Sequence, residues 1–198
     1  MSRVPPRDPG TPSRLIDLSR YYHASLADSW GGSPDDRDDN SLSELKAGIQ
    51  TLAGVPFDVR GIVQLGSLHG YPRRVSGIPV GLNCRSLHFL HAASWAVDPK
   101  GTRVGHYRVN FADGRSEDIP LVLGTNIEDW TVGPNDPWPD SVAIAWEGAG
   151  ESARRRRLTN RLYRFTWQNP RPEQEVRTLD FVWAAMSTEP FLVAMTAE

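Results

Sequence analysis

The sequence has a single cysteine, few lysines and no long apolar run. Cys84 alone excludes an internal disulfide framework and any metal site built from several cysteines. No stretch reaches the roughly 18 apolar residues of a membrane-spanning helix, so no membrane span is expected. The polar, proline-rich start lacks the apolar core of a secretory signal. Localisation therefore stays open: cytoplasmic as the chain stands, or extracytoplasmic if it is cut from a longer parent.

The chain also lacks a strong net charge. Its 198 residues carry a formal charge of -2 at pH 7, and nearly all its basic side chains are arginine, the lysines being Lys46 and Lys100. A slightly acidic chain has no bulk attraction for nucleic acid, which we do not expect as a partner. The length is enough for one substantial core and short for two.

Turn-forming and aromatic residues are plentiful. The chain has 17 glycines, 16 prolines and seven tryptophans, a composition typical of short strands joined by turns rather than of helices. Alternating or apolar runs predict strands in the segments 57–65, 78–80, 87–93, 105–111, 117–123, 142–146, 162–167, 176–185 and 191–196. The expected fold class is all-β, an antiparallel β-sandwich or jelly roll with few short helical turns.

The clearest local pattern lies between Gly105 and Leu123. Two alternating runs flank the turn sequence Ala-Asp-Gly-Arg at 112–115, and Asp-Gly between such runs is typical of a β-hairpin because glycine accepts the positive φ of the turn. Pro120 lies in the returning run and has no N–H to donate. We therefore expect it at a sheet edge or a bulge.

Two regions frame the predicted domain. Residues 1–14 hold four prolines and little to bury, so they are predicted to be a disordered tail or linker, with a single β-sandwich domain over 15–198. Near the end of the chain, four arginines at 154–157 lie in a predicted loop. We interpret this run as a solvated loop, and the alternative is a docking patch for an acidic partner.

Several segments together resemble a known family. They are Ile-Asp-Leu-Ser-Arg-Tyr-Tyr (16–22), Gly-Val-Pro-Phe-Asp-Val-Arg-Gly-Ile-Val-Gln-Leu (54–65), Leu-His-Phe-Leu-His-Ala-Ala-Ser-Trp (87–95), Tyr-Arg-Val-Asn-Phe-Ala-Asp-Gly (107–114), Ile-Pro-Leu (119–121), Glu-Asp-Trp (128–130), Val-Ala-Ile-Ala-Trp (142–146), Leu-Tyr-Arg-Phe-Thr-Trp-Gln-Asn-Pro (162–170) and Pro-Phe-Leu-Val-Ala-Met-Thr (190–196). Their order is similar to that of the galactose-binding-like β-sandwich domains, which occur as accessory modules of bacterial glycoside hydrolases and in surface or regulatory proteins. The resemblance implies sugar binding or scaffolding rather than catalysis.

The long polar loop over 124–140 carries the best functional residues. Trp130 and Trp138 lie in it, and an indole face can stack on the apolar face of a sugar ring while polar neighbours bind its hydroxyls. The predicted ligand-binding residues are Trp130, Trp138, Asp129, Asn135, Asp136 and Asn126. The alternative is that both tryptophans fold inward and cap the core, as we expect for the strand tryptophans Trp146, Trp167 and Trp183.

Metal binding has weaker support. Asp36, Asp38 and Asn40 occupy the first three ligand positions of a calcium loop. Ser41 stands where that loop needs glycine and Ala47 where it needs glutamate, which excludes an EF-hand and leaves a looser structural calcium site as a possible cofactor. The alternative is a solvated acidic loop. His88 and His91 are three apart on a predicted strand, so they should face opposite sides and not share a metal.

The sequence therefore favours a non-catalytic carbohydrate-binding module whose partner is a polysaccharide or other glycan. The main alternative is a protein-interaction or assembly subunit of a larger complex with the same β-sandwich scaffold. A hydrolase with a site that no sequence pattern marks is a third alternative. No cofactor is required by any of the three.

Overall fold

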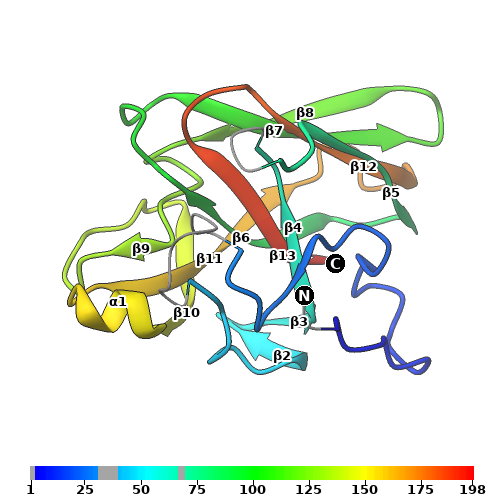
Figure 1. The fold of residues 1–198 in the computed structure, drawn as a ribbon. Helices are drawn as coiled ribbons and strands as arrows, with labels where there is room; N and C mark the ends of the chain where they lie inside the picture. The colour runs from blue at the N-terminus through cyan, green and yellow to red at the C-terminus, as the bar shows by residue number, and fades with distance from the viewer. Residues whose placement is uncertain (1–2, 31–39, 67–69) are drawn as a thin grey trace.

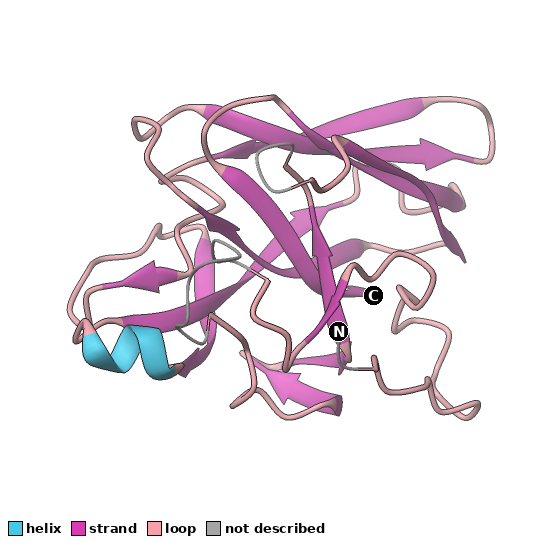
Figure 2. Cartoon of the chain, viewed as in Figure 1, coloured by secondary structure: helices cyan, strands magenta, loops and turns pink. Residues whose placement is uncertain are grey.

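The computed structural model describes residues 3–30, 40–66 and 70–198, and it is built almost entirely of β-strands. All pairs of neighbouring strands in these ranges run antiparallel. Two main sheets pack against each other, as Figures 1 and 2 show. The prediction of an all-β antiparallel sandwich is confirmed.

The larger sheet has seven strands and forms the middle of the molecule. Its order is β1-β4-β13-β6-β11-β10, and β9 pairs with β11 beside that path. The strands are β1 (Ala24–Ser25), β4 (Gly61–Gln64), β6 (Ser86–Ser94), β9 (Thr131–Val132), β10 (Val142–Gly148), β11 (Thr159–Gln168) and β13 (Glu189–Ala197). Every residue of β6 and β13 is buried, because both faces of these central strands are covered.

The second sheet has four strands in the order β5-β12-β7-β8 and lies at the top of Figure 1. Its strands are β5 (Arg74–Leu82), β7 (Arg103–Phe111), β8 (Ser116–Val122) and β12 (Val176–Trp183). A hairpin of β2 (Gly48–Leu52) and β3 (Val55–Val59) lies at the bottom of the same view. The chain therefore covers both faces of the seven-stranded sheet.

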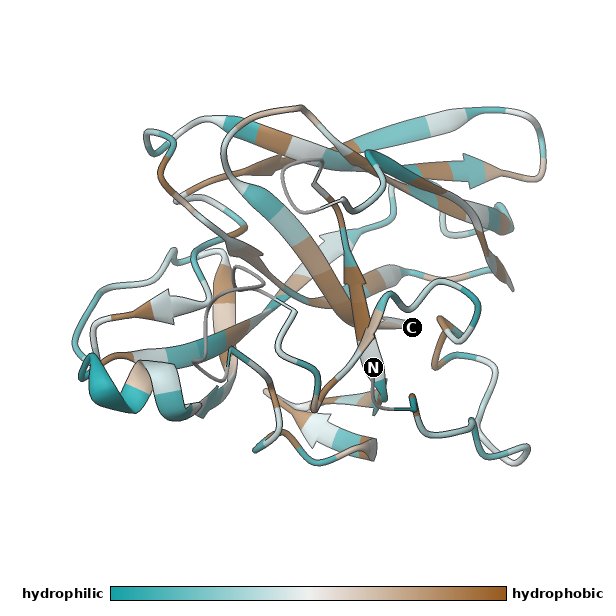
Figure 3. Ribbon diagram, in the orientation of Figure 1, coloured by the Kyte–Doolittle hydropathy of each residue, from teal (hydrophilic) through white to brown (hydrophobic). Residues whose placement is uncertain are grey.

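The space between the two main sheets holds the central aromatic packing. Phe89 of β6 and Tyr107 of β7 stack with their ring centroids 4.1 Å apart, and Phe181 of β12 lies 4.9 Å from Tyr107. A second apolar cluster lies on the other face of the seven-stranded sheet and includes Phe57, Leu90 and Phe191. Figure 3 shows apolar residues concentrated in the central strands.

The predicted hairpin is present as β7 and β8. The amide of Gly114, at a φ of 87°, donates to the carbonyl of Phe111 at 3.1 Å. Pro120 lies in β8, which is the edge strand of its sheet, and pairs with His106. The edge position predicted for this proline is confirmed, because its missing N–H breaks no ladder there.

The arginine run was predicted to be a loop, but it contributes to a helix, α1 (Glu151–Arg155). Arg155 bonds Glu151 one turn earlier at 2.5 Å, and Arg154 pairs with Glu44. Glu151 in the first turn and the arginines in the last turn both suit the helix dipole. Among the described residues, α1 is the one helix, and its five residues are far too few to cross a membrane.

The segment predicted to be a tail carries one anchored side chain. Arg7 donates from Nη1 to Asp58 of β3 at 2.8 Å, and from Nη2 to the carbonyl of Leu15. Asp58 also accepts from the buried Arg60 at 3.0 Å. This charged cluster attaches residues near the start of the chain to the β2–β3 hairpin.

Candidate functional site

The long loop between β8 and β10 borders a cleft with a volume of about 360 Å³. This volume lies within the range of roughly 300–1,000 Å³ common to small-molecule sites. Its lining combines one aromatic ring, two prolines, one valine, one glycine and three charged side chains. The lining residues are Lys100, Gly124, Glu128, Val132, Asp136, Pro137, Trp138 and Pro139. Trp138 and Asp136 are two of the residues that the sequence predicted for ligand binding.

Trp138 is 48% exposed and lies at the cleft, so part of its ring is available to a ligand. The guanidinium carbon of Arg161 lies 5.6 Å from the centroid of the Trp138 ring, a cation–π distance. Because the arginine is itself buried, it supports the ring from the protein side. This contact holds the indole in place without covering it fully.

Arg161 also holds the loop that carries Trp138. Its Nη1 donates to the carbonyl of Asp136 at 2.7 Å and its Nη2 to the carbonyl of Pro134 at 2.9 Å. Its Nε donates to Glu147 of β10 at 2.9 Å. Arg161 lies in β11, between β9 and β10, so a rigid strand fixes the segment after β9 that carries Trp138.

The polar groups of the cleft are partly engaged. Glu128 accepts the amide of Asp129 at 2.8 Å on one carboxylate oxygen, and its other oxygen pairs with Lys100. Asp136 accepts the amide of Gly133 at 2.7 Å. A carboxylate has about four lone-pair sites, so each of these acids retains capacity to accept further hydrogen bonds from hydroxyl groups.

Asp129 is behind the cleft rather than in its lining. One carboxylate oxygen accepts the amide of Thr131 at 2.8 Å, and the other accepts the amide of Ala96 at 3.3 Å. Burial raises the pKa of Asp129 to about 6, opposed by these two hydrogen bonds. The side chain thus connects the loop after β6 to the strand β9, instead of reaching a ligand.

Trp130 does not have the role predicted for it. Its ring is 5% exposed and lies in the core, with its centroid 4.9 Å from Trp30 and 6.1 Å from Phe191. The inward alternative therefore holds for Trp130. Trp30, which comes from the segment before the acidic loop, covers it, and no local pattern around Trp130 reveals that partner.

The two predicted asparagines also differ from expectation. Asn126 is buried: its Oδ1 accepts the amide of Val122 at 2.8 Å, and its Nδ2 donates to the carbonyl of Pro120 at 2.8 Å. It shapes the turn after β8 and is not available to a ligand. Asn135 is exposed in the same loop as Trp138, next to Asp136 but outside the residues that line the cleft.

The calcium prediction rests mainly on Asp36 and Asp38, which lie outside the described residues. Asn40 is described, and its backbone amide donates to the hydroxyl of Ser29 at 3.1 Å. Within residues 3–30, 40–66 and 70–198, no group of three or more histidine, cysteine or acidic side chains has a geometry suited to a metal ion. Calcium binding at the acidic loop stays a prediction.

The histidines of β6 face opposite sides of the sheet, as the strand period predicts. His91 is buried between the sheets, 3.0 Å from the hydroxyl of Tyr107 and 3.0 Å from the carbonyl of Asn126. His88 lies on the other face, 2.9 Å from Glu198 and 2.9 Å from Thr166. His88 also borders a more open hollow of about 750 Å³.

The sequence did not single out Arg161 or Lys100. Arg161 directly precedes the predicted strand over 162–167. The one sequence feature that could have marked it as a functional residue is its charge at the start of an apolar strand. Lys100 is one of two lysines in a chain whose other basic side chains are arginine. Neither signal indicates that these residues lie near Trp138, because that depends on how β11 and the loop after β6 pack.

No family model matches the chain, and no curated protein sequence is significantly similar to it.

Proposed function

We propose that the chain is a non-catalytic carbohydrate-binding module that holds a glycan in the cleft beside Trp138. The observation that carries the proposal is the half-exposed indole of Trp138 at a cleft that also contains Lys100, Glu128 and Asp136. A sugar ring needs this combination, because its C–H face is apolar and its edge is lined with hydroxyls. The resemblance to galactose-binding-like domains supports the same proposal.

Binding is favoured over catalysis by the partners of the acidic groups. Glu128 is paired with Lys100 and accepts a backbone amide, and Asp136 accepts the amide of Gly133. Both carboxylates are thus held by neighbouring groups and keep lone pairs that can accept hydrogen bonds from the hydroxyls of a ligand, which is what binding requires.

The test is affinity electrophoresis against soluble polysaccharides of different chemistry: xylan, mixed-linkage β-glucan, galactomannan, pectin and alginate. We expect retardation by at least one of them, followed by a measurable dissociation constant in calorimetry. Trp138→Ala should abolish the retardation, while Ile49→Ala, which truncates another exposed apolar side chain on β2, should not. No retardation of the wild type by any polysaccharide, or equal retardation of Trp138→Ala, would count against the proposal.

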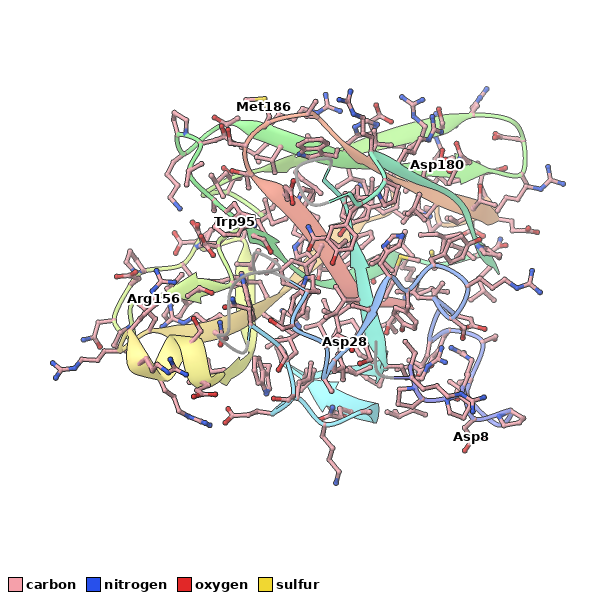
Figure 4. The ribbon with its side chains drawn as sticks, in the orientation of Figure 1. Asp8, Asp28, Trp95, Arg156, Asp180 and Met186 are labelled. Carbon is pink, nitrogen blue, oxygen red and sulfur yellow. The ribbon has the colours of Figure 1, made fainter. Side chains whose placement is uncertain are left out.

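A second candidate function is a protein-interaction subunit that uses the arginine helix. Arg156 and Arg157 are exposed at the end of α1, and Figure 4 labels Arg156 beside this helix. Guanidinium groups suit an acidic surface on a larger assembly. Pull-down from the source cell with wild type and with a variant carrying Arg156→Ser and Arg157→Ser tests this function; recovery of the same partners by both contradicts it.

A further inference from the structure

A second exposed tryptophan lies close to the cleft. Trp95 follows directly after β6 and is 43% exposed. In Figure 4 it lies on the same side of the molecule as β9. The part of the chain that the structure describes has four large exposed apolar side chains. Trp95 and Val97 lie on the loop after β6, and Trp138 lies on the loop beside the cleft. The fourth, Ile49, lies elsewhere, on β2.

Hydrogen bonds place the Trp95 loop against the cleft. The carbonyl of Glu128, a lining residue, accepts the amide of Ala93 at 2.9 Å, just before the end of β6. At the other end of the loop, Lys100 lines the cleft itself. The segment between them, which carries Trp95, therefore runs beside residues that line the cleft.

The backbone of Trp95 is held in an unfavourable conformation. Its φ is 56°, in the left-handed region that bulky side chains seldom adopt. Asp129 accepts the amide of the following residue, Ala96, and Thr188 donates its amide to Asp98 at 2.7 Å further along the loop. Strain of this kind persists where surrounding contacts enforce it, and it is concentrated at ligand sites.

We propose that Trp95 forms a second stacking subsite, so that the site takes an oligosaccharide rather than a single sugar. This inference rests on the proposed function. Trp138 at the cleft binds one sugar ring, and Trp95 on the adjoining loop binds a ring further along the same glycan. Asp129 is a positioning residue, because it holds the Trp95 turn and does not touch the glycan.

The test compares glycan lengths. Oligosaccharides of one to six units are prepared from the polysaccharide that retards the wild type, and their affinities are measured by calorimetry. For the wild type we expect affinity to rise about tenfold between one and four units. Trp95→Ala should remove that rise and leave single-sugar affinity unchanged within about twofold, while Trp95→Phe, which keeps a ring, should retain most of it.

A spectroscopic measurement keeps the test independent of the stability of the alanine variant. In protein labelled with 5-fluorotryptophan, the ¹⁹F resonance of Trp95 is assigned by its loss in Trp95→Phe. It should shift with the tetrasaccharide and stay in place with the monosaccharide. If Trp95→Ala keeps the length dependence, or the resonance does not respond to the tetrasaccharide, the second subsite is wrong and the Trp138 site stands. If no polysaccharide binds, both proposals are overturned.

Discussion

Arg161 lies beneath Trp138, with its guanidinium carbon 5.6 Å from the centroid of the indole ring. The same side chain donates to two carbonyls of the loop that carries this tryptophan. A buried cation thereby holds an exposed aromatic ring and its backbone together. A ring fixed in this way loses little conformational entropy when a ligand stacks on it, which favours binding.

The first prediction concerns this support. Arg161→Met leaves the carbonyls of Pro134 and Asp136 without their donor and removes the cation under Trp138. We expect a loss of about 1–3 kcal/mol in unfolding free energy, measured by urea denaturation, together with faster amide hydrogen exchange at Asp136. The control is Arg108→Met, because Arg108 is exposed and pairs with Asp118 on the surface; it should change little. Equal effects of the two variants would contradict the role assigned to Arg161.

The second prediction separates the two tryptophans of the loop. Trp130 is buried against Trp30 and Phe191, so Trp130→Ala should cost about 3–5 kcal/mol of unfolding free energy by opening a cavity. Trp138→Ala removes a half-exposed ring and its contact with Arg161, and should cost under about 1 kcal/mol. Denaturant unfolding of both variants checks the difference. A large loss for Trp138→Ala would mean that this ring is a structural element.

The third prediction concerns His91. Burial lowers the pKa of His91 from 6.5 to about 4, because a charged imidazole would lose its hydration between the sheets. The unfolded chain binds this proton more readily than the folded chain does. The stability that neutral His91 contributes is therefore fully present above pH 6.5 and is lost as the pH falls toward 4. The loss from this residue should reach about 3 kcal/mol. His91→Phe should lower stability at pH 7 but remove this part of the acid sensitivity.

The fourth prediction has the opposite sign and concerns Asp129. Burial raises its pKa from 3.8 to about 6, so the folded state favours the protonated acid. The stability that this residue contributes is present below pH 3.8 and is lost as the pH rises through 6, by about 3 kcal/mol at pH 7. The unfolding free energy of the wild type, minus that of Asp129→Asn, should therefore fall by about 3 kcal/mol from pH 3 to pH 7. A difference independent of pH would contradict it.

Local patterns explain which parts of the fold were predictable. The hairpin around Asp113-Gly114 depends on residues within one turn, and the sequence predicts it well. The helix at Glu151–Arg155 was missed, although glutamate before arginine suits a helix, because its short length gives no period to recognise. The two-residue strands β1 and β9 have no pattern at all and exist through pairing with β4 and β11.

The site shows the same division. Trp130 and Trp138 lie eight residues apart in one polar loop, and their local sequences are alike in composition. What makes one of them buried is Trp30, 100 positions earlier in the chain, and what fixes the other is Arg161, from a strand that follows the loop. The sequence indicates that this loop is a candidate binding site, but tertiary packing decides which of its two indole rings faces solvent.

The most direct measurement of the central claim is the retardation of wild type and Trp138→Ala in gels that contain the polysaccharide panel, with circular dichroism to establish that both are folded. The account predicts that at least one polysaccharide slows the wild type and that the folded Trp138→Ala variant migrates as it does in a gel without polysaccharide. Wild type and variant slowed equally, or neither slowed by any polysaccharide, would contradict it.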